Sequence, residues 1–228
     1  MNIIITSGGT SEKIDQVRSI TNHATGRLGS IIANTFLKDG HKVTLITTKL
    51  AIKPEKHKNL TIIIIESVQD LMEILELHVK TADAIVHSMA VSDYTPIYMT
   101  DFKKVTNTKH LEDLLLKNNQ SPKISSQSDY QVLFLKKTPK VIQYIKQWNP
   151  SIKLFGFKLL VDVSKEELIK VAQKSLLTNH ADFILANDLK DITNTQHKAL
   201  LISEKEITPV NTKEEIANLI RKKATQYD

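Results

Sequence analysis

Cysteine is absent from the 228 residues of this sequence. Its absence excludes a disulfide framework, a thiolate metal site and a catalytic thiol, and it fits a reducing compartment. Long apolar runs are absent too: the longest, around residues 62–65, is far shorter than the ~20 residues that cross a bilayer. The first residues lack the basic and apolar regions of a signal peptide. We therefore expect a cytoplasmic protein that binds no membrane.

The charge is nearly balanced: 31 Lys and Arg residues against 25 Asp and Glu residues give a formal charge of +6. The lysines are scattered, and the densest cluster, residues 221–223, ends a C-terminal helical pattern, where basic side chains complement the helix dipole. We expect no nucleic-acid partner, whereas a mild positive charge suits anionic substrates. Clustered metal-binding histidines, a GxSxG motif and a Ser-His-Asp order are missing, which argues against a transition-metal site and a serine hydrolase.

Apolar segments alternate with amphipathic ones along most of the chain. Strands that are apolar throughout and alternate with helices indicate a parallel sheet covered on both faces. We predict strands at residues 2–6, 41–47, 60–65, 83–87, 130–135, 153–159 and 182–186. We predict helices at residues 26–38, 68–79, 140–147 and 165–177, then a hairpin at 199–203 and 206–210 and a last helix capped by Thr212.

The predicted fold class is α/β: a Rossmann-like, three-layer parallel sheet with helices on both faces, plus a C-terminal hairpin and helix. The length suits one sizeable core, so residues 1–228 are expected to form a single domain that binds its ligands. Residues 95–128 are polar and weakly periodic. We expect them to form a long mobile segment, a loop with one short helix near residues 110–116.

Two glycine-containing segments lie where a parallel sheet binds ligands. Ser7-Gly8-Gly9-Thr10 follows the first strand, and glycine lets the backbone turn sharply and bring N–H groups close to a phosphate. Residues 18–29 precede the first helix, whose N-terminus attracts anions. The spacing is neither GxGxxG nor a P-loop. Taken together, the two segments favour a phosphate site over a tight strand exit.

Four residues before the first helix are candidate substrate ligands. Arg18 can pair with a phosphate or carboxylate, although it could also be a surface arginine. Asn22 offers a neutral donor and acceptor. Thr25 and Gly26 stand at the helix N-terminus, where Thr25 is also a candidate N-cap.

Later strand ends carry further candidates for nucleotide, metal and substrate. Ser88-Met89-Ala90 and Asp93 follow the fourth strand, where an Asp can hold a ribose hydroxyl or Mg²⁺, or turn the chain. Phe157-Lys158 could stack a base, although a core Phe is the commoner reading. Asn187 could contact the ligand or cap the chain. Lys123, in the polar segment, could close over phosphates, but among so many lysines its chemistry alone does not select it.

An ordered set of short motifs resembles the phosphopantothenate–cysteine ligase (phosphopantothenoylcysteine synthetase) family, in its stand-alone bacterial form. The resemblance covers nearly the whole chain, and the order is more specific than any one motif. The matching residues are 5–10, 14–18, 21–23, 26–29, 90–94, 123–126, 157–159 and 186–188.

The resemblance implies ligation of 4′-phosphopantothenate to L-cysteine in coenzyme A biosynthesis. A nucleoside triphosphate with Mg²⁺ would activate the carboxylate through an acyl-nucleotidyl intermediate, with release of pyrophosphate. It also implies catalytic roles for Asn22, which handles the intermediate, and for Lys123, which closes over the site. The family is dimeric, so a homodimer is expected.

Two departures from the fused bacterial form bear on the nucleotide. Ala24-Thr25-Gly26 stands where that form has Ser-Ser-Gly, and Lys123 is the one lysine where it has a lysine-rich run. The Lys-Ile-Ser-Ser and Phe-Lys-Leu runs look more like the eukaryotic members, which prefer ATP. The co-substrate is therefore CTP or ATP.

Two other functions share the strand, glycine loop and helix at the start of the chain. A short-chain oxidoreductase using NAD(P) fits less well, because the glycine spacing differs and a Tyr-x-x-x-Lys pair is missing. A non-catalytic dinucleotide-binding regulator would use the same loop without a charged closing segment.

Overall fold

The computed structural model describes residues 1–119, 122–125, 127–193 and 195–226. Its centre is an eight-stranded sheet. The strands β5, β4, β1, β6, β9 and β10, in that spatial order, run parallel, and β11 and β12 are antiparallel. The predicted α/β fold is therefore confirmed, including the hairpin at the end. In spatial order the strands are β12 (Ile207–Val210), β11 (Ala199–Ile202), β10 (Phe183–Asp188), β9 (Lys153–Leu160), β6 (Ala84–His87), β1 (Asn2–Ser7), β4 (Lys42–Thr48) and β5 (Leu60–Ile65).

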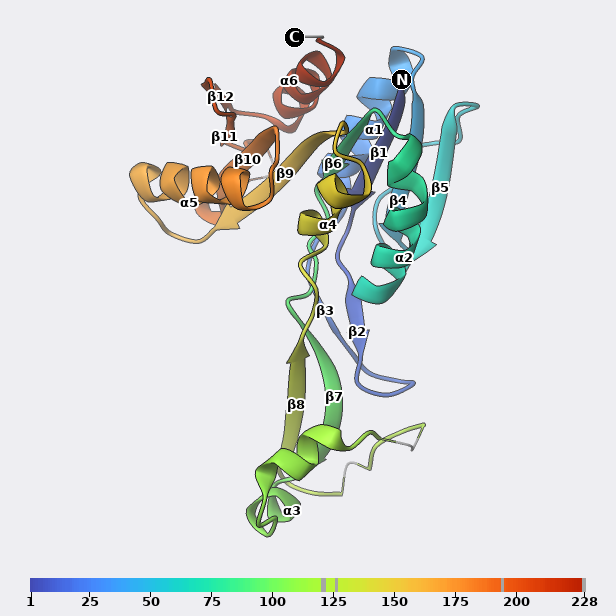
Figure 1. The fold of residues 1–228 in the computed structure, drawn as a ribbon, viewed down its shortest axis with the longest axis vertical. Helices are drawn as coiled ribbons and strands as arrows, with labels where there is room; N and C mark the ends of the chain where they lie inside the picture. The colour runs from blue at the N-terminus through green and yellow to red at the C-terminus, as the bar shows by residue number, and fades with distance from the viewer. Residues whose placement is uncertain (120–121, 126, 194, 227–228) are drawn as a thin grey trace.

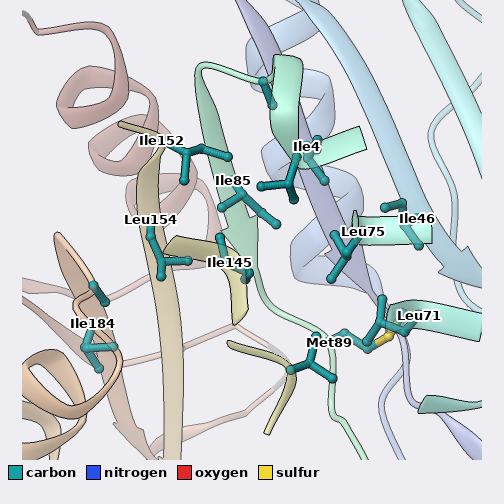
Figure 2. Close-up of a cluster of buried hydrophobic side chains, with 14 of the residues drawn as sticks. Ile4, Ile46, Leu71, Leu75, Ile85, Met89, Ile145, Ile152, Leu154 and Ile184 are labelled. Carbon is teal, nitrogen blue, oxygen red and sulfur yellow. The ribbon is translucent and has the colours of Figure 1, made fainter. Parts of the chain in front are cut away.

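Two helical layers cover the two faces of the sheet. Helices α1 (Arg27–Lys38) and α6 (Lys213–Thr225) pack together on one face, over a cluster that includes Ile5 and Phe36. The opposite face carries α2 (Val68–His78), α4 (Val141–Trp148) and α5 (Lys165–Thr178). Figure 2 shows the second cluster, in which Ile4, Ile85 and Leu154 of the sheet meet Leu71, Leu75 and Ile145 of the helices. Because both faces are covered, the inner strands are mostly apolar, as the sequence predicts, whereas Ile62 and Ile64 of the edge strand β5 stay partly exposed.

Side-chain caps explain where three of these helices begin. Ser67, Ser164 and Thr212 each accept a hydrogen bond from a backbone N–H of the first turn. At α2 the bond is reciprocal, because Asp70 also accepts from the Ser67 N–H at 2.9 Å. α1 differs: its N-cap is Gly26, with φ +74°, so Thr25 is not the N-cap. Gly26 has no side chain that could accept from the first turn, and the Arg27 N–H donates instead to the Thr25 hydroxyl at 3.3 Å.

The described residues between 94 and 137 form an arm that projects from the body of the molecule (Figure 1). The arm consists of β7 (Tyr94–Asp101) paired antiparallel with β8 (Gln131–Lys137), the short helix α3 (Phe102–Thr106) and the 3-10 turn η2 (Leu111–Leu116). The long loop expected from residue 95 is therefore wrong for β7 and α3, whereas the short helix near 110–116 is confirmed as η2. The strand near residues 130–135 is also confirmed, but it pairs with β7 outside the central sheet.

A small hairpin between β1 and α1 was not predicted. It pairs β2 (Ser11–Lys13) with β3 (Ser19–Thr21), and it lies beside β7 at the carboxyl edge of the sheet (Figure 1). Buried Glu12 attaches it to the body, because its carboxylate accepts from the Val68 N–H at the start of α2 at 2.8 Å. Two further 3-10 turns, η1 (Val79–Thr81) and η3 (Leu189–Asp191), connect elements of the body.

Candidate functional site

The switch point of the sheet lies between β1 and β6. From β1 the chain passes to β4 and β5 on one side, and then to β6, β9 and β10 on the other. In such sheets ligands bind where the two connections diverge, at the carboxyl ends of the strands. Here the segment between β1 and α1 and the loop after β6 together hold most of the predicted site residues.

Two glycines with positive φ bring the β1 loop to the start of α1. Gly8 has φ +84°, and a Cβ there would lie 2.8 Å from the Thr48 Oγ1 and 2.9 Å from the Ala51 Cβ. Gly26 has φ +74°, and its Cβ would lie 2.9 Å from the same Ala51 Cβ and 3.4 Å from the Gly8 nitrogen. Other residue types would be strained and crowded at both positions. The two predicted phosphate-binding segments therefore adjoin each other.

Gly9 and Asn22 are in closer contact still. A Cβ on Gly9 would lie 2.1 Å from the Asn22 carbonyl oxygen, so only glycine fits. The Asn22 N–H donates to the Thr10 carbonyl at 3.2 Å, and its side-chain amide donates to the Ala90 carbonyl at 3.2 Å. Asn22 thus joins the β1 loop to the β6 loop, and its side chain is only half-buried.

The loops after β1 and β6 are hydrogen-bonded to each other. The Thr10 N–H donates to the Ala90 carbonyl at 3.0 Å, and the Ala90 N–H donates to the Gly8 carbonyl at 2.9 Å. The buried Thr10 hydroxyl bonds the Ser92 hydroxyl at 3.0 Å and accepts from the Ser92 N–H at 2.9 Å. Ser88 donates its hydroxyl to the Thr6 carbonyl at 2.7 Å. These hydroxyls therefore hold the loops together.

Met89 and His87 are buried beneath these loops. The Met89 side chain lies in the core against Leu71, so this residue can meet a ligand through its backbone only (Figure 2). His87 is buried, and its Nδ1 lies 2.9 Å from the Thr6 hydroxyl. Burial lowers the pKa of His87 to about 4, so the ring is neutral at pH 7. The sequence analysis missed His87, since a histidine at the end of an apolar strand carries no local signal.

A second group of predicted residues meets at the hairpin loop. Arg18 donates from Nη2 at 2.6 Å and Nε at 3.1 Å to Asp15, whose side chain is fully buried. The Arg18 guanidinium and the Ile124 N–H hold the pKa of Asp15 far below its usual range. Arg18 also donates to the Ile124 carbonyl at 3.1 Å, which brings the segment that contains Lys123 to this loop. The Asp15 role was not predicted.

Asp93, the predicted metal ligand, lies after β6 and is exposed. Its carboxylate forms an ion pair with Lys140, from the start of α4. Groups of three or more metal-binding side chains are missing from the described part of the chain. Mg²⁺ commonly takes one or two protein carboxylates and completes its shell with water and phosphates. Asp93 therefore fits Mg²⁺ as one ligand among several, in competition with Lys140.

The remaining candidates lie farther along the carboxyl edge, on β9 and β10. Phe157 packs against the α1–α6 core cluster, as the core reading of that residue predicts. Lys158 pairs in register with Ala186, next to Asn187. At the end of β10, the Asp188 carboxylate accepts hydrogen bonds from the N–H groups of Asp162 at 3.0 Å and Val163 at 2.9 Å.

Asp188 is charged in spite of its position. Burial acts to raise its pKa, but the amide hydrogen bonds from Val163, Lys190 and Asp162 prevail and lower it to about 2. The carboxylate therefore ties the loop after β9 to the turn after β10, and Asn187 stands at the base of that connection.

A family model described as the DNA/pantothenate metabolism flavoprotein C-terminal domain matches residues 1–227. The chain belongs to this family. A crystal structure of the DNA/pantothenate metabolism flavoprotein from Streptococcus pneumoniae shares 53% identity at a TM-score of 0.94, covering 98% of this chain and 97% of that one. The structure of a Cab2 H337A mutant in complex with phosphopantothenate-cysteine covers 98% of this chain and 86% of its own, with a TM-score of 0.73; at 17% identity it supports the fold alone.

Among the curated relatives of the family is the coenzyme A biosynthesis bifunctional protein CoaBC of Thermococcus kodakarensis. It is 32% identical over 219 residues, which cover 94% of this chain and 48% of that protein. The chain thus spans about half the length of the curated relatives it matches. None of the helices in the described residues is both long and apolar enough to span a bilayer.

Proposed function

We propose that this chain ligates 4′-phosphopantothenate to L-cysteine in coenzyme A biosynthesis, as a phosphopantothenate–cysteine ligase. The observation that supports this best is the meeting of three segments at the switch point: the Gly8-Gly9 loop, the α1 N-terminus at Gly26, and the loop after β6. Family membership over residues 1–227 and the relatives named for coenzyme A biosynthesis point to the same activity.

The first half of the reaction needs negative charge to be stabilised at a phosphoryl group. Backbone N–H groups at Gly8, Gly9 and the α1 N-terminus suit this task, because they are fixed in place before the substrate binds. Lys123 adds a cation, and Thr25 lies beside the same helix end. No protein nucleophile is required, since the substrate carboxylate attacks and pyrophosphate leaves. Mg²⁺, when bound with Asp93 as a ligand, would neutralise phosphate charge.

The second half of the reaction brings the cysteine amine to the acyl group. Asn22 is suited to hold the intermediate, because its side-chain amide is already oriented by the Ala90 carbonyl and its carbonyl oxygen can accept. Arg18 binds the substrate phosphate or carboxylate through its Nη1, because Asp15 and the Ile124 carbonyl take its Nε and Nη2 donors. Asn187 contributes from the neighbouring strand end.

The nucleotide is CTP or ATP, with its phosphates at Gly8, Gly9 and Thr10. Its base and ribose lie along the carboxyl edge, towards Ser88, Met89 and Ala90, with Phe157 and Lys158 beyond on β9. Phe157 is half-buried against the α1–α6 core cluster, so only part of its ring is available to a base. The two nucleotides are therefore compared directly in the experiment below.

The active form is a homodimer, which the arm supports. Leu116 is 85% exposed and Tyr130 75% exposed, and Phe102, Leu111 and Leu115 are each about half exposed. Apolar side chains gathered on one projecting element are characteristic of protein interfaces. A second copy of this chain is the occupant that the symmetry of most soluble oligomers favours. The expected setting is the cytoplasm.

The test is pyrophosphate release by the purified protein with 4′-phosphopantothenate and Mg²⁺, with CTP and ATP in parallel and cysteine added or withheld. We expect release that depends on phosphopantothenate, and amide product only with cysteine. Asn22→Asp should accumulate the acyl-nucleotide with little amide, and Lys123→Ala should lower kcat. Folded protein that releases no pyrophosphate but is stabilised by NADH would instead support the oxidoreductase or the dinucleotide-binding regulator.

A further inference from the structure

The Asp15 carboxylate connects two segments that lie 109 residues apart in the sequence. Its Oδ2 accepts from the Ile124 N–H at 3.1 Å and from the Arg18 guanidinium, and its Oδ1 accepts from the N–H groups of Val17 and Arg18, both at 2.9 Å. Its side chain has no exposed surface. Burying a carboxylate is unfavourable unless its lone pairs are used, and here five donors use them.

Arg18 completes the connection by binding the carbonyl of the same residue. Its Nη2 donates to the Ile124 carbonyl at 3.1 Å, so Ile124 is bound at both its N–H and its C=O. The Gln16 N–H adds a bond to the Pro122 carbonyl at 3.0 Å. We call Asp15, Arg18 and Ile124 the Asp15 clamp. Lys123 stands between two residues whose backbones are bound to the hairpin loop, and the buried Ile124 side chain fixes the same segment.

We propose that Asp15 is a positioning residue, which through the Asp15 clamp holds the backbone of Lys123 where its amine acts in nucleotidyl transfer. The assignment rests on the proposed function in one respect, the role of Lys123. Ordering a flexible polar segment costs about 1–2 kcal/mol of free energy for each residue. Five hydrogen bonds to one buried carboxylate can offset this cost. Asp15 itself, buried under its donors, touches no substrate.

The clamp can be tested without any activity measurement, because the chain has no cysteine. Ile124→Cys places a single buried thiol in the clamped segment and keeps the backbone bonds. Ala224→Cys places one in α6, far along the chain, as a report on global opening. We expect Asp15→Asn to raise the rate of thiol labelling at position 124 by tenfold or more and to leave the rate at position 224 unchanged. Equal acceleration at both positions, or none at 124, overturns the clamp.

A matched control is the Asp39–Arg221 pair, which joins the same two groups at 2.7 Å on the opposite side of the body. Asp39→Asn should leave labelling at position 124 and kcat as in the parent protein. If Asp39→Asn accelerates labelling at position 124 as much as Asp15→Asn does, the effect is a general one of charge or stability, and the proposal fails.

Kinetics test the positioning role itself. With saturating substrates, Asp15→Asn should lower kcat about as much as Lys123→Ala does, and adding Asp15→Asn to Lys123→Ala should lower kcat no further. Multiplicative losses in the double variant would mean that Asp15 acts independently of Lys123. A parent protein that releases no pyrophosphate would refute the proposed function, while the labelling rates would still decide whether the clamp exists.

Discussion

The switch-point loops and the arm leave the sheet at the same edge but are built differently. The loops after β1 and β6 are held by backbone contacts and small residues, and their key feature is the closeness of Gly9 to the Asn22 carbonyl. The arm is a two-stranded ribbon with apolar side chains on its outside and a small core of its own, in which Tyr98 stacks on Phe134. The loops therefore suit the precise placement of a small ligand, and the arm suits a partner surface.

The largest effect should come from the most crowded contact in the loops. Gly9→Ala would place a Cβ 2.1 Å from the Asn22 carbonyl, and because both sides are backbone the loops must move. We expect a loss of about 3 kcal/mol in the free energy of unfolding, together with loss of pyrophosphate release. Denaturant titration measures the first quantity. Gly40→Ala is the control, since a Cβ there meets nothing within 4 Å; its cost should be confined to the φ of +79°. An equal loss of unfolding free energy in both variants would show that the contact between Gly9 and the Asn22 carbonyl is not the cause.

A second prediction concerns acid. The pKa of His87 is about 4 in the folded protein against an ordinary 6.5, so between these values the unfolded chain binds the extra proton and stability falls as the pH falls. At pH 5 this costs about 2 kcal/mol relative to neutral pH. His197, whose pKa burial and Lys213 also lower to about 4, adds to the same slope.

The measurement is the Tm at pH 7 and pH 5. His87→Gln should reduce the difference between the two Tm values, whatever it does to the Tm at pH 7. His110→Gln in the exposed part of the arm is the matched control and should leave the difference unchanged. An unaltered pH dependence in His87→Gln would show that His87 is not the group responsible.

A third prediction separates the arm from the body. Tyr98 is buried and stacks on Phe134 with ring centroids 6.1 Å apart, entirely within the arm. Tyr98→Ala should speed amide exchange in β7 and β8 by about tenfold or more and leave β1 and β6 protected, because the two cores are separate. Hydrogen exchange read segment by segment measures this. Equal loss of protection in both regions would show that arm and body unfold together.

The smallest effect on stability should come from Leu116, at the exposed end of η2. Leu116→Ser should change the unfolding free energy of the monomer by less than about 0.5 kcal/mol, since the side chain has little to lose. If the arm is the dimer interface, the same variant should weaken the dimer measurably in sedimentation or light scattering. Leu50→Ser is the control, since Leu50 is a leucine on the body that is even more exposed. A dimer that tolerates Leu116→Ser as well as Leu50→Ser would move the interface elsewhere.

The body was predictable because its strands are continuous apolar runs. A strand that is buried on both faces is a continuous apolar run, which can be recognised in the sequence. Gly8 and Gly9 at the switch point follow the first of these runs directly. Strand β7 was missed because it contains Pro96 and because its partner β8 begins 30 residues after it ends, beyond any local pattern. β2 and β3 are three residues each and mostly polar, too short to show a period.

The site was predictable as a set of segments and less so as a set of contacts. Residue chemistry indicated Arg18 and the family resemblance indicated Lys123, but their link through Asp15 and Ile124 depends on a fold that brings positions 15 and 124 together. The same holds for Lys140, which reaches Asp93 from the start of α4. The mobility expected for residues 95–128 stays a prediction, which the hydrogen-exchange experiment would also measure.

The contact between Gly9 and Asn22 has a consequence for how this site can diverge. The position of Asn22 depends on the absence of a Cβ on Gly9, opposite the Asn22 carbonyl. Glycine has no smaller replacement, and every larger one displaces the backbone of Asn22. Changes in this part of the molecule are therefore more accessible through side chains of the neighbouring loop, such as Thr25, than through the two residues that make the contact.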